Sequence, residues 1–531
     1  MPIQSIIKNK HLPTAILITL IILIITIYSY ILFLFPYQEG GDLLFHTWFA
    51  NQISNSGSIP GDMPTSETTS LYSFTPLFHV LSSYFSQITD LELPISMSIL
   101  NIILIILLIL SIYILSNILL NNKVISIIAI FAIFLFNQEI FYYYLPRNIV
   151  LTLFLVLIFL LVKIFRNNSH ALKDYIIFSL LTLSLILFHH INAIYAATII
   201  CAIAIPFFII HKKRSKSLFI IICITIAILL FILLNLPSFI NQAFPIDTSD
   251  PSFKVFTDSQ NNIPLNFLAP LLSITHSFFL IFVIAGLLIF LFNLRKACGT
   301  QIKFLVIFPW LICSLLLAYQ TSINYNFFAS RAISLLIPAL GIIGAYGFYK
   351  IIRLISRNNY LSNIIVLIIL VLSSLYPVIT LLLANNITPI KYGLSRENVN
   401  EQLKIKDKFS NKIVLSDPST MYLLTTIADM KPAYNYEHTN LTRNKFIEWE
   451  PVQQLFFGTN DEFTAYLSTT KYDYIIISAR TREYFDEADF SRFENQNIIE
   501  KIYESDLLDP KDYRENPSIK YPYYSVYQSV Q

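Results

Sequence analysis

The chain has 531 residues, of which 55% are hydrophobic and only 13% are charged, with a formal net charge of +3. A soluble globular protein carries about 25% charged residues, so this composition excludes an ordinary soluble domain and indicates a polytopic membrane protein. The small net charge gives no support to nucleic-acid binding. The four cysteines show no metal-ligand spacing, and we predict neither a disulfide framework nor a zinc site.

Eleven apolar segments are candidate transmembrane helices. A helix needs roughly 20 residues to cross the bilayer, and the third and fifth segments are shorter. The first segment is longer than the apolar core of a signal peptide and precedes no small-x-small cleavage site, so we expect it to be retained. The predicted spans are 14–35, 96–119, 123–137, 149–165, 174–189, 191–210, 217–236, 267–292, 302–320, 331–349 and 361–384.

The distribution of positive charge predicts the orientation. Cytoplasmic loops collect Lys and Arg. With the amino terminus inside, the inner segments carry sixteen Lys and Arg residues and the outer loops before the tail carry three, Arg147, Lys254 and Arg331. An odd number of spans then places residues 385–531 outside. We expect a multi-pass protein of the cell (plasma) membrane with a cytoplasmic amino terminus.

The first outer loop, 36–95, contains six acidic residues and no Lys or Arg. Two short helices are predicted in it, over 42–54 and 75–89. We expect these helices to lie along the membrane interface with aromatic side chains at headgroup depth. These side chains are Phe45, Trp48, Phe78 and Tyr84.

Asp42 opens the first of these helices, and His46 follows one turn later on the same face. Asp42 fits a helix cap, because aspartate accepts hydrogen bonds from free backbone N–H groups. It also fits a general base or metal ligand at the outer surface, with Glu39 nearby and His46 sharing a proton or a cation. The sequence leaves both interpretations open.

Further candidates lie at the outer ends of other spans. Glu139 and Arg147 belong to the second outer loop and fit either an interfacial anchor or a cation ligand with a phosphate-binding arginine. His189 and His190 are either ordinary interfacial histidines or contacts for a pyrophosphate or sugar. Arg331 begins the tenth span, where it either snorkels or holds a lipid phosphate through its planar guanidinium.

The spans themselves contain almost no ionisable residues. Proton- or ion-coupled transporters usually need such residues at mid-membrane, so the pattern favours an enzyme that acts on a lipid-linked substrate at the outer surface. The alternatives are a transporter or flippase of lipid-linked saccharides and a non-catalytic membrane assembly factor.

The tail, 385–531, is predicted to be a small folded α/β domain, because about 140 residues are enough for one. Short apolar, β-branched runs at 412–416 and 472–478 indicate buried strands. Helical spacing is found over 419–427 and 460–468. The membrane domain is therefore expected to cover 1–384, including the first outer loop.

These features resemble the GT-C superfamily of integral-membrane glycosyltransferases, which use polyprenyl-phosphate-linked sugars. Eleven spans followed by an outward tail are similar to that family. The chain has no Trp-Trp-Asp signature of oligosaccharyltransferases, since Trp449 stands in Glu-Trp-Glu-Pro. The motifs that carry the resemblance are Glu39 to Asp42, His46, Gly57-Ser-Ile-Pro60, Thr75-Pro-Leu-Phe-His79, His189-His-Ile-Asn192 and Arg331.

The resemblance implies transfer of a sugar from a polyprenyl-phosphate-linked donor to a lipid, glycan or protein acceptor on the outer face. It implies that Asp42, with Glu39 and His46, forms the catalytic group. A divalent cation, Mg or Mn, would be held by Asp42 and Glu139. The residues expected to contact substrate or phosphate are Arg331, Arg147, His189, His190 and His79. The Ile-, Asn- and Lys-rich composition is typical of an AT-rich prokaryotic genome, archaeal or bacterial.

Overall fold

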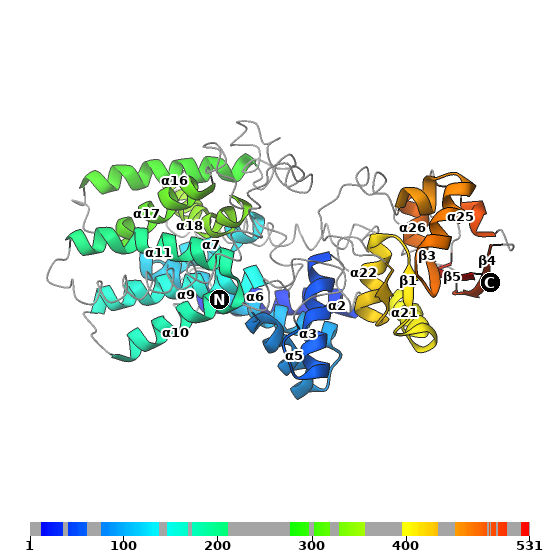
Figure 1. Cartoon of the computed structure of the whole chain (residues 1–531). Helices are drawn as coiled ribbons and strands as arrows, with labels where there is room; N and C mark the ends of the chain where they lie inside the picture. Colours follow the sequence, from blue (N-terminus) through cyan, green and yellow to red (C-terminus); the bar gives the residue numbers. More distant parts are fainter. Residues whose placement is uncertain are drawn as a thin grey trace, which may run out of the picture. The chain divides into compact units, whose positions relative to one another are not determined.

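The computed structural model describes residues 12–34, 41–60, 76–136, 146–167, 172–210, 277–296, 302–318, 329–355, 396–433, 452–485, 488, 490–494, 498–506 and 522–529. The chain divides into two compact units (Figure 1). Unit 1 consists of Met1–Thr26 and Asn101–Leu383, and unit 2 consists of Ile27–Leu100 and Ala384–Gln531. The first outer loop thus groups with the tail.

Unit 1 is helical. The predicted spans coincide with helices where their residues are described. The segments 217–236 and 361–384, and the first part of the eighth span (267–276), lie outside the described residues, so the count of eleven stays a prediction. Among the described helices, three are long and apolar enough to cross a bilayer. The helices are α2 (Leu12–Leu34), α6 (Leu93–Leu120), α7 (Lys123–Phe136), α9 (Pro146–Asn167), α10 (Leu172–Phe188), α11 (His190–Ile210), α16 (Ser277–Lys296), α17 (Ile302–Ala318) and α18 (Ala329–Ile355), with the boundaries between the units falling inside α2 and α6.

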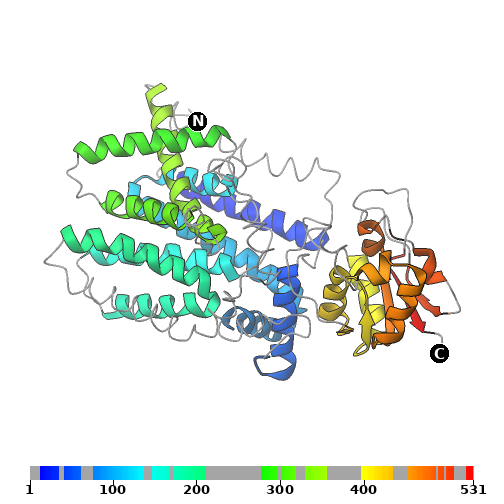
Figure 2. The same cartoon turned by 45° about the horizontal axis from the view of Figure 1, so that its top comes forward.

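Helix α18 is the centre of this bundle. It packs against α7, α11, α16 and α17, while α9, α10 and α11 lie side by side (Figure 2). Glycines let α16 and α18 approach closely, because a Cβ atom at Gly347 would lie 2.1 Å from the carbonyl oxygen of Phe282. The buried Trp310 of α17 donates a hydrogen bond to the carbonyl oxygen of Leu335 at 2.9 Å.

Unit 2 contains a five-stranded mixed sheet in the order β2-β1-β3-β5-β4. Strand β1 pairs in parallel with β2 and β3, and β5 pairs antiparallel with β3 and β4. The predicted strands and helices of the tail are confirmed at β1, β3, α22 and α25. The strands are β1 (Ile413–Leu415), β2 (Lys431–Pro432), β3 (Tyr474–Ser478), β4 (Ile499–Glu504) and β5 (Tyr524–Ser529), and the helices are α21 (Arg396–Phe409), α22 (Pro418–Ile427), η3 (Gln453–Phe457), α25 (Asn460–Thr469), α26 (Ala479–Tyr484) and η4 (Phe490–Glu494).

Both faces of the sheet are apolar, which explains why helices cover both. Successive strand residues point to opposite faces. Val414 and Ile476 pack with α21 and α22 on one face, whereas Leu415 and Ile477 pack with η3 and α25 on the other. Such continuous apolar strands are expected when a sheet is buried on both sides.

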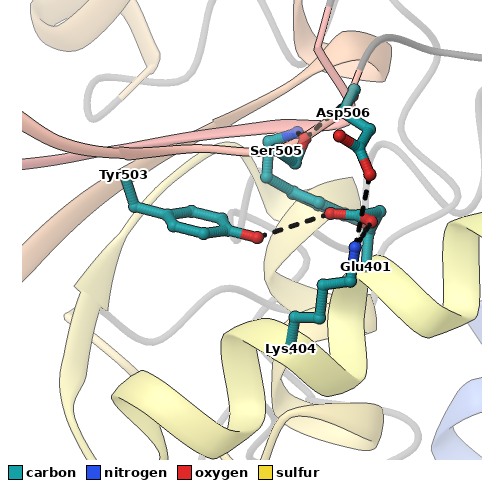
Figure 3. A network of polar contacts seen from close by, with 6 residues as sticks. Glu401, Lys404, Tyr503, Ser505 and Asp506 are labelled. Atoms are coloured by element: carbon teal, nitrogen blue, oxygen red, sulfur yellow. Dashed lines mark hydrogen bonds and ion pairs between the residues drawn. The ribbon is translucent and has the colours of Figure 1, made fainter.

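A polar network attaches α21 to the edge of the sheet (Figure 3). The buried carboxylate of Glu401 accepts hydrogen bonds from Lys404 and, at 3.4 Å, from the hydroxyl of Tyr503 on β4. Lys404 also lies 3.3 Å from Asp506. These contacts with Glu401, and then those with Asp506, raise the pKa of Lys404. The network keeps a buried carboxylate satisfied.

The two predicted helices of the first outer loop are confirmed as α3 (Gly41–Ser56) and α5 (Leu77–Thr89). The expectation for their aromatic residues is wrong for two of them and untested for the others, since the Phe45 side chain lies outside what the structure describes. Tyr84 is exposed, but Trp48 is 6% exposed and Phe78 is fully buried, so the prediction that these two lie at headgroup depth is wrong. Their apolar rings are covered by protein instead, because α3 packs between α5 and α22 within unit 2.

Candidate functional site

Helix α3 carries the principal candidate, Asp42. This residue is the second of the helix, and its side chain lies outside what the structure describes, as does Glu39. The choice between helix cap and general base therefore stays a prediction. What the structure does define is the packing that holds the rest of α3 in place.

His46 and His79 join α3 to α5. The Nδ1 atom of His46 lies 2.8 Å from the Nε2 atom of His79, so one ring donates a hydrogen bond to the other. His46 is 4% exposed and His79 is fully buried. The ring of Phe49 lies 4.5 Å from that of His79, and Phe78 lies 5.1 Å from His46, measured between ring centroids.

The apolar surroundings keep His79 neutral. Burial lowers the pKa of His79 well below its ordinary value, and the neighbouring His46 lowers it further. When His79 is neutral, one N–H between the two rings is enough to form the hydrogen bond. Protonation of both rings would instead place two positive charges in contact. His79 is therefore the neutral member of the hydrogen bond that connects the two loop helices.

On its other side, α3 is part of the core of the tail. Trp48 and Phe49 share one hydrophobic cluster with Met421, Leu424 and the sheet residue Ile476. Burial of a large aromatic side chain is worth about 3–5 kcal/mol by truncation to alanine. The helix that carries Asp42 is thus held firmly against α22.

Helix α22 is itself fixed by a buried network at the carboxyl ends of β1 and β3. Asp417 caps α22 and accepts hydrogen bonds from the Thr420 amide at 3.1 Å and the Thr481 hydroxyl at 2.5 Å. Ser478 lies 2.7 Å from the hydroxyl of Thr420. Ligands often bind at this edge of an open α/β sheet, but these polar groups satisfy one another inside the protein. We assign the network a structural role.

The candidates of unit 1 lie on separate helices. Arg147 is half-buried in the first turn of α9. His189 precedes α11, and its Nδ1 atom accepts a hydrogen bond from the Asn192 amide at 3.4 Å, which fits a helix cap. His190 and Arg331 begin α11 and α18, and their side chains are not described.

The predicted cation site is not tested by the described side chains. Glu139 lies outside the described residues, and so does the carboxylate of Asp42. Within the described part of the chain, no three His, Cys, Asp or Glu residues lie together as metal ligands. Carboxylate oxygens are the donors that Mg²⁺ prefers, so the chemistry of the two predicted ligands fits such an ion.

The sequence did not reveal two of these contacts. His79 was expected to contact substrate, and its partner His46 lies 33 residues away in the chain. The contact of Trp48 with α22 joins segments that are far more distant in sequence. The signal for both is the recurrence of large apolar and aromatic residues in an otherwise polar loop.

Comparison with known proteins identifies the fold. No protein-family model and no curated protein matches the chain. Among solved structures, the Archaeoglobus fulgidus oligosaccharyltransferase, tethered with an acceptor peptide containing the NVT sequon, aligns with a TM-score of 0.57 and 13% identity over 88% of this chain and 69% of its own. ArnT from Cupriavidus metallidurans, bound to undecaprenyl phosphate, aligns with a TM-score of 0.52 and 10% identity over 90% of this chain and 95% of its own. The chain has the GT-C fold.

A third structure with the GT-C fold extends the comparison. The arabinofuranosyltransferase AftD from Mycobacteria aligns with a TM-score of 0.54 and 11% identity over 97% of this chain and 40% of its own. The neighbours are membrane glycosyltransferases of the GT-C type. At these identities the similarity establishes the fold, and the expected resemblance to GT-C proteins is confirmed at that level.

Proposed function

We propose that the protein is a membrane glycosyltransferase that moves a sugar from a polyprenyl-phosphate-linked donor to a lipid, glycan or protein acceptor on the outer face of the cell membrane. The observation that carries the proposal is the firm packing of α3, the helix with Asp42 at its start, in a chain with the GT-C fold. ArnT bound to undecaprenyl phosphate supports a lipid-phosphate carrier.

In this mechanism Asp42 is the general base. Its carboxylate removes the proton from the acceptor hydroxyl as the acceptor oxygen bonds to the anomeric carbon. The bond between that carbon and the carrier phosphate oxygen breaks, and its electrons leave with the phosphate. Arg331 and Arg147 bind the phosphate, because a guanidinium pairs with its oxygens in a bidentate manner. Glu39 lies three residues before Asp42 in the sequence and would add a second negative charge near the base.

His46 and His79 receive a positioning role in this proposal. Both are buried and hydrogen-bonded to each other, which supports a role in holding α3 against α5. The catalytic role expected of His46 and the substrate contact expected of His79 stay predictions. His189 and His190 stay candidates for contact with the carrier phosphate at the start of α11. A Mg²⁺ or Mn²⁺ ion, if held by Asp42 and Glu139, would supply positive charge next to the leaving phosphate.

The decisive variant is Asp42→Asn, which keeps the size of the side chain but removes the base. We expect transfer of labelled sugar from undecaprenyl- or dolichyl-phosphate donors in membranes to fall about 10²- to 10⁴-fold, the usual contribution of a general base. Asp90→Asn is the matched control, since Asp90 is exposed in the same loop and has a left-handed backbone that asparagine also adopts. Undiminished transfer by a folded Asp42→Asn protein would remove Asp42 from the mechanism.

A further inference from the structure

Two lysines flank one aromatic cluster in unit 1. The Lys303 Nζ atom lies 5.1 Å from the ring centroid of Phe304 and 5.9 Å from that of Phe290. The Lys350 Nζ atom lies 5.5 Å from the centroid of Tyr346. The rings of Phe290 and Tyr346 are themselves 5.6 Å apart. The cluster therefore brings together residues from α16, α17 and α18.

The positive charges of this cluster have no carboxylate partner among the described residues, where neither lysine forms an ion pair. The Phe290 and Tyr346 rings connect the two ammonium groups at one aromatic cluster, so their like charges repel each other. Cation–π contacts with the aromatic rings compensate each charge only in part. An anion bound to both ammonium groups would relieve the repulsion.

The surroundings favour an anion that carries apolar chains. Leu288 and Phe292 of α16 are 51% and 72% exposed, and Leu354 of α18, one turn beyond Lys350, is 77% exposed. These side chains would meet acyl chains in a bilayer. Tyr346 also accepts a hydrogen bond from the amide of Asn293 at 3.3 Å, which fixes the polar edge of its ring.

We propose that Lys303 and Lys350 bind the phosphate of an anionic phospholipid at the end of the bundle formed by α16, α17 and α18. The distribution of positive charge in the sequence places this end on the cytoplasmic side, where anionic lipids attract basic residues. The site is separate from the proposed transfer chemistry, for which the outer surface is expected. Its ligand is a structural or regulatory lipid and not the sugar carrier.

The test measures lipid binding by the full-length protein. The purified protein is delipidated in detergent, titrated with phosphatidylglycerol or phosphatidylcholine, and examined by native mass spectrometry. We expect phosphatidylglycerol to bind more tightly than phosphatidylcholine. In the double variant Lys303→Gln/Lys350→Gln, the ratio of phosphatidylglycerol affinity to phosphatidylcholine affinity should fall roughly 5- to 30-fold. The reason is that each basic residue at a membrane surface contributes about 1 kcal/mol to binding of an anionic lipid.

Lys123→Gln is the matched control, since Lys123 is exposed at the start of α7 and is predicted on the same side of the membrane. It should keep the full preference for phosphatidylglycerol. Equal losses in the control and the double variant would show that the lysines only add general surface charge, and would overturn the proposal. Displacement of the lipid by millimolar inorganic phosphate would overturn the lipid as the ligand. If the double variant is unstable, Lys303→Gln and Lys350→Gln are compared singly, and the preference should fall in each.

Discussion

The buried histidine pair is the clearest case of a single-residue effect. His79 is neutral in the folded protein because burial and the neighbouring His46 lower its pKa. In the unfolded chain its pKa returns to about 6.5. Below that pH the unfolded state binds a proton that the folded state does not, so stability is retained above about pH 6.5 and decreases as the pH falls through that value.

The corresponding prediction concerns the pH dependence of unfolding. Between pH 6.5 and 5.5 the wild-type protein should lose about 1 kcal/mol of unfolding free energy through His79 alone, since the unfolded histidine is half protonated at the start of this range. His79→Gln keeps a hydrogen-bonding group but cannot be protonated, so its thermal midpoint in detergent should depend less on pH. Equal slopes for the two proteins over this range would contradict the assignment of a buried, neutral His79.

At the scale of elements, the important contact is that between α3 and α22. Trp48 and Phe49 place an outer-loop helix in the same core as the tail's sheet. The proposed base is on that helix, so we expect the tail to help hold it in position. The hydrogen bond from the Thr481 hydroxyl to Asp417 then fixes the start of α22 to the segment that follows β3.

Shortening Trp48 tests this contact. Trp48→Ala should lower the free energy of unfolding by about 3–5 kcal/mol. It should also expose the loop to limited proteolysis and lower the rate of sugar transfer. Trp48→Phe should restore most of the stability, the protease resistance and the transfer rate, because it keeps an apolar ring at the same position. Tyr84→Ala is the control, since this aromatic residue of α5 is 62% exposed. A proteolysis pattern unchanged by Trp48→Ala would show that the contact does not hold the loop.

At the scale of the whole molecule, the proposed reaction requires the loop and tail to lie on the outer side of the membrane. The charge distribution predicts this orientation. The four native cysteines, two of which are partly buried in α11 and α17, would first be replaced by serine. Exposed positions are then available on both predicted sides of the membrane.

A single cysteine introduced on each predicted side of the membrane reports the orientation. Ser468→Cys in the tail should react with a membrane-impermeant maleimide in intact cells. Lys173→Cys, at the start of α10, should react only after permeabilisation. Both residues are exposed in the structure, so the difference would arise from the membrane. Labelling of Lys173→Cys in intact cells would reverse the topology.

The sequence by itself predicted the apolar helices and part of the tail, whereas α21, β2, β4 and β5 were not predicted. The apolar segments predicted α2 through α18 wherever they are described, and the β-branched runs predicted β1 and β3. These predictions succeed because hydrophobic periodicity and length are properties of neighbouring residues. The acidic, cation-free composition of the outer loop and the short motifs that resemble the GT-C superfamily could also be recognised from residues close together in the chain.

Only the tertiary structure decided which of these elements meet. It paired His46 with His79, buried Trp48 against α22, and brought Lys303 and Lys350 to one aromatic cluster. Such contacts depend on how the shapes of distant side chains fit together in a close-packed interior. Local patterns contain no record of that fit, and this is why an aromatic residue expected at the lipid surface proved to be the core of a protein contact.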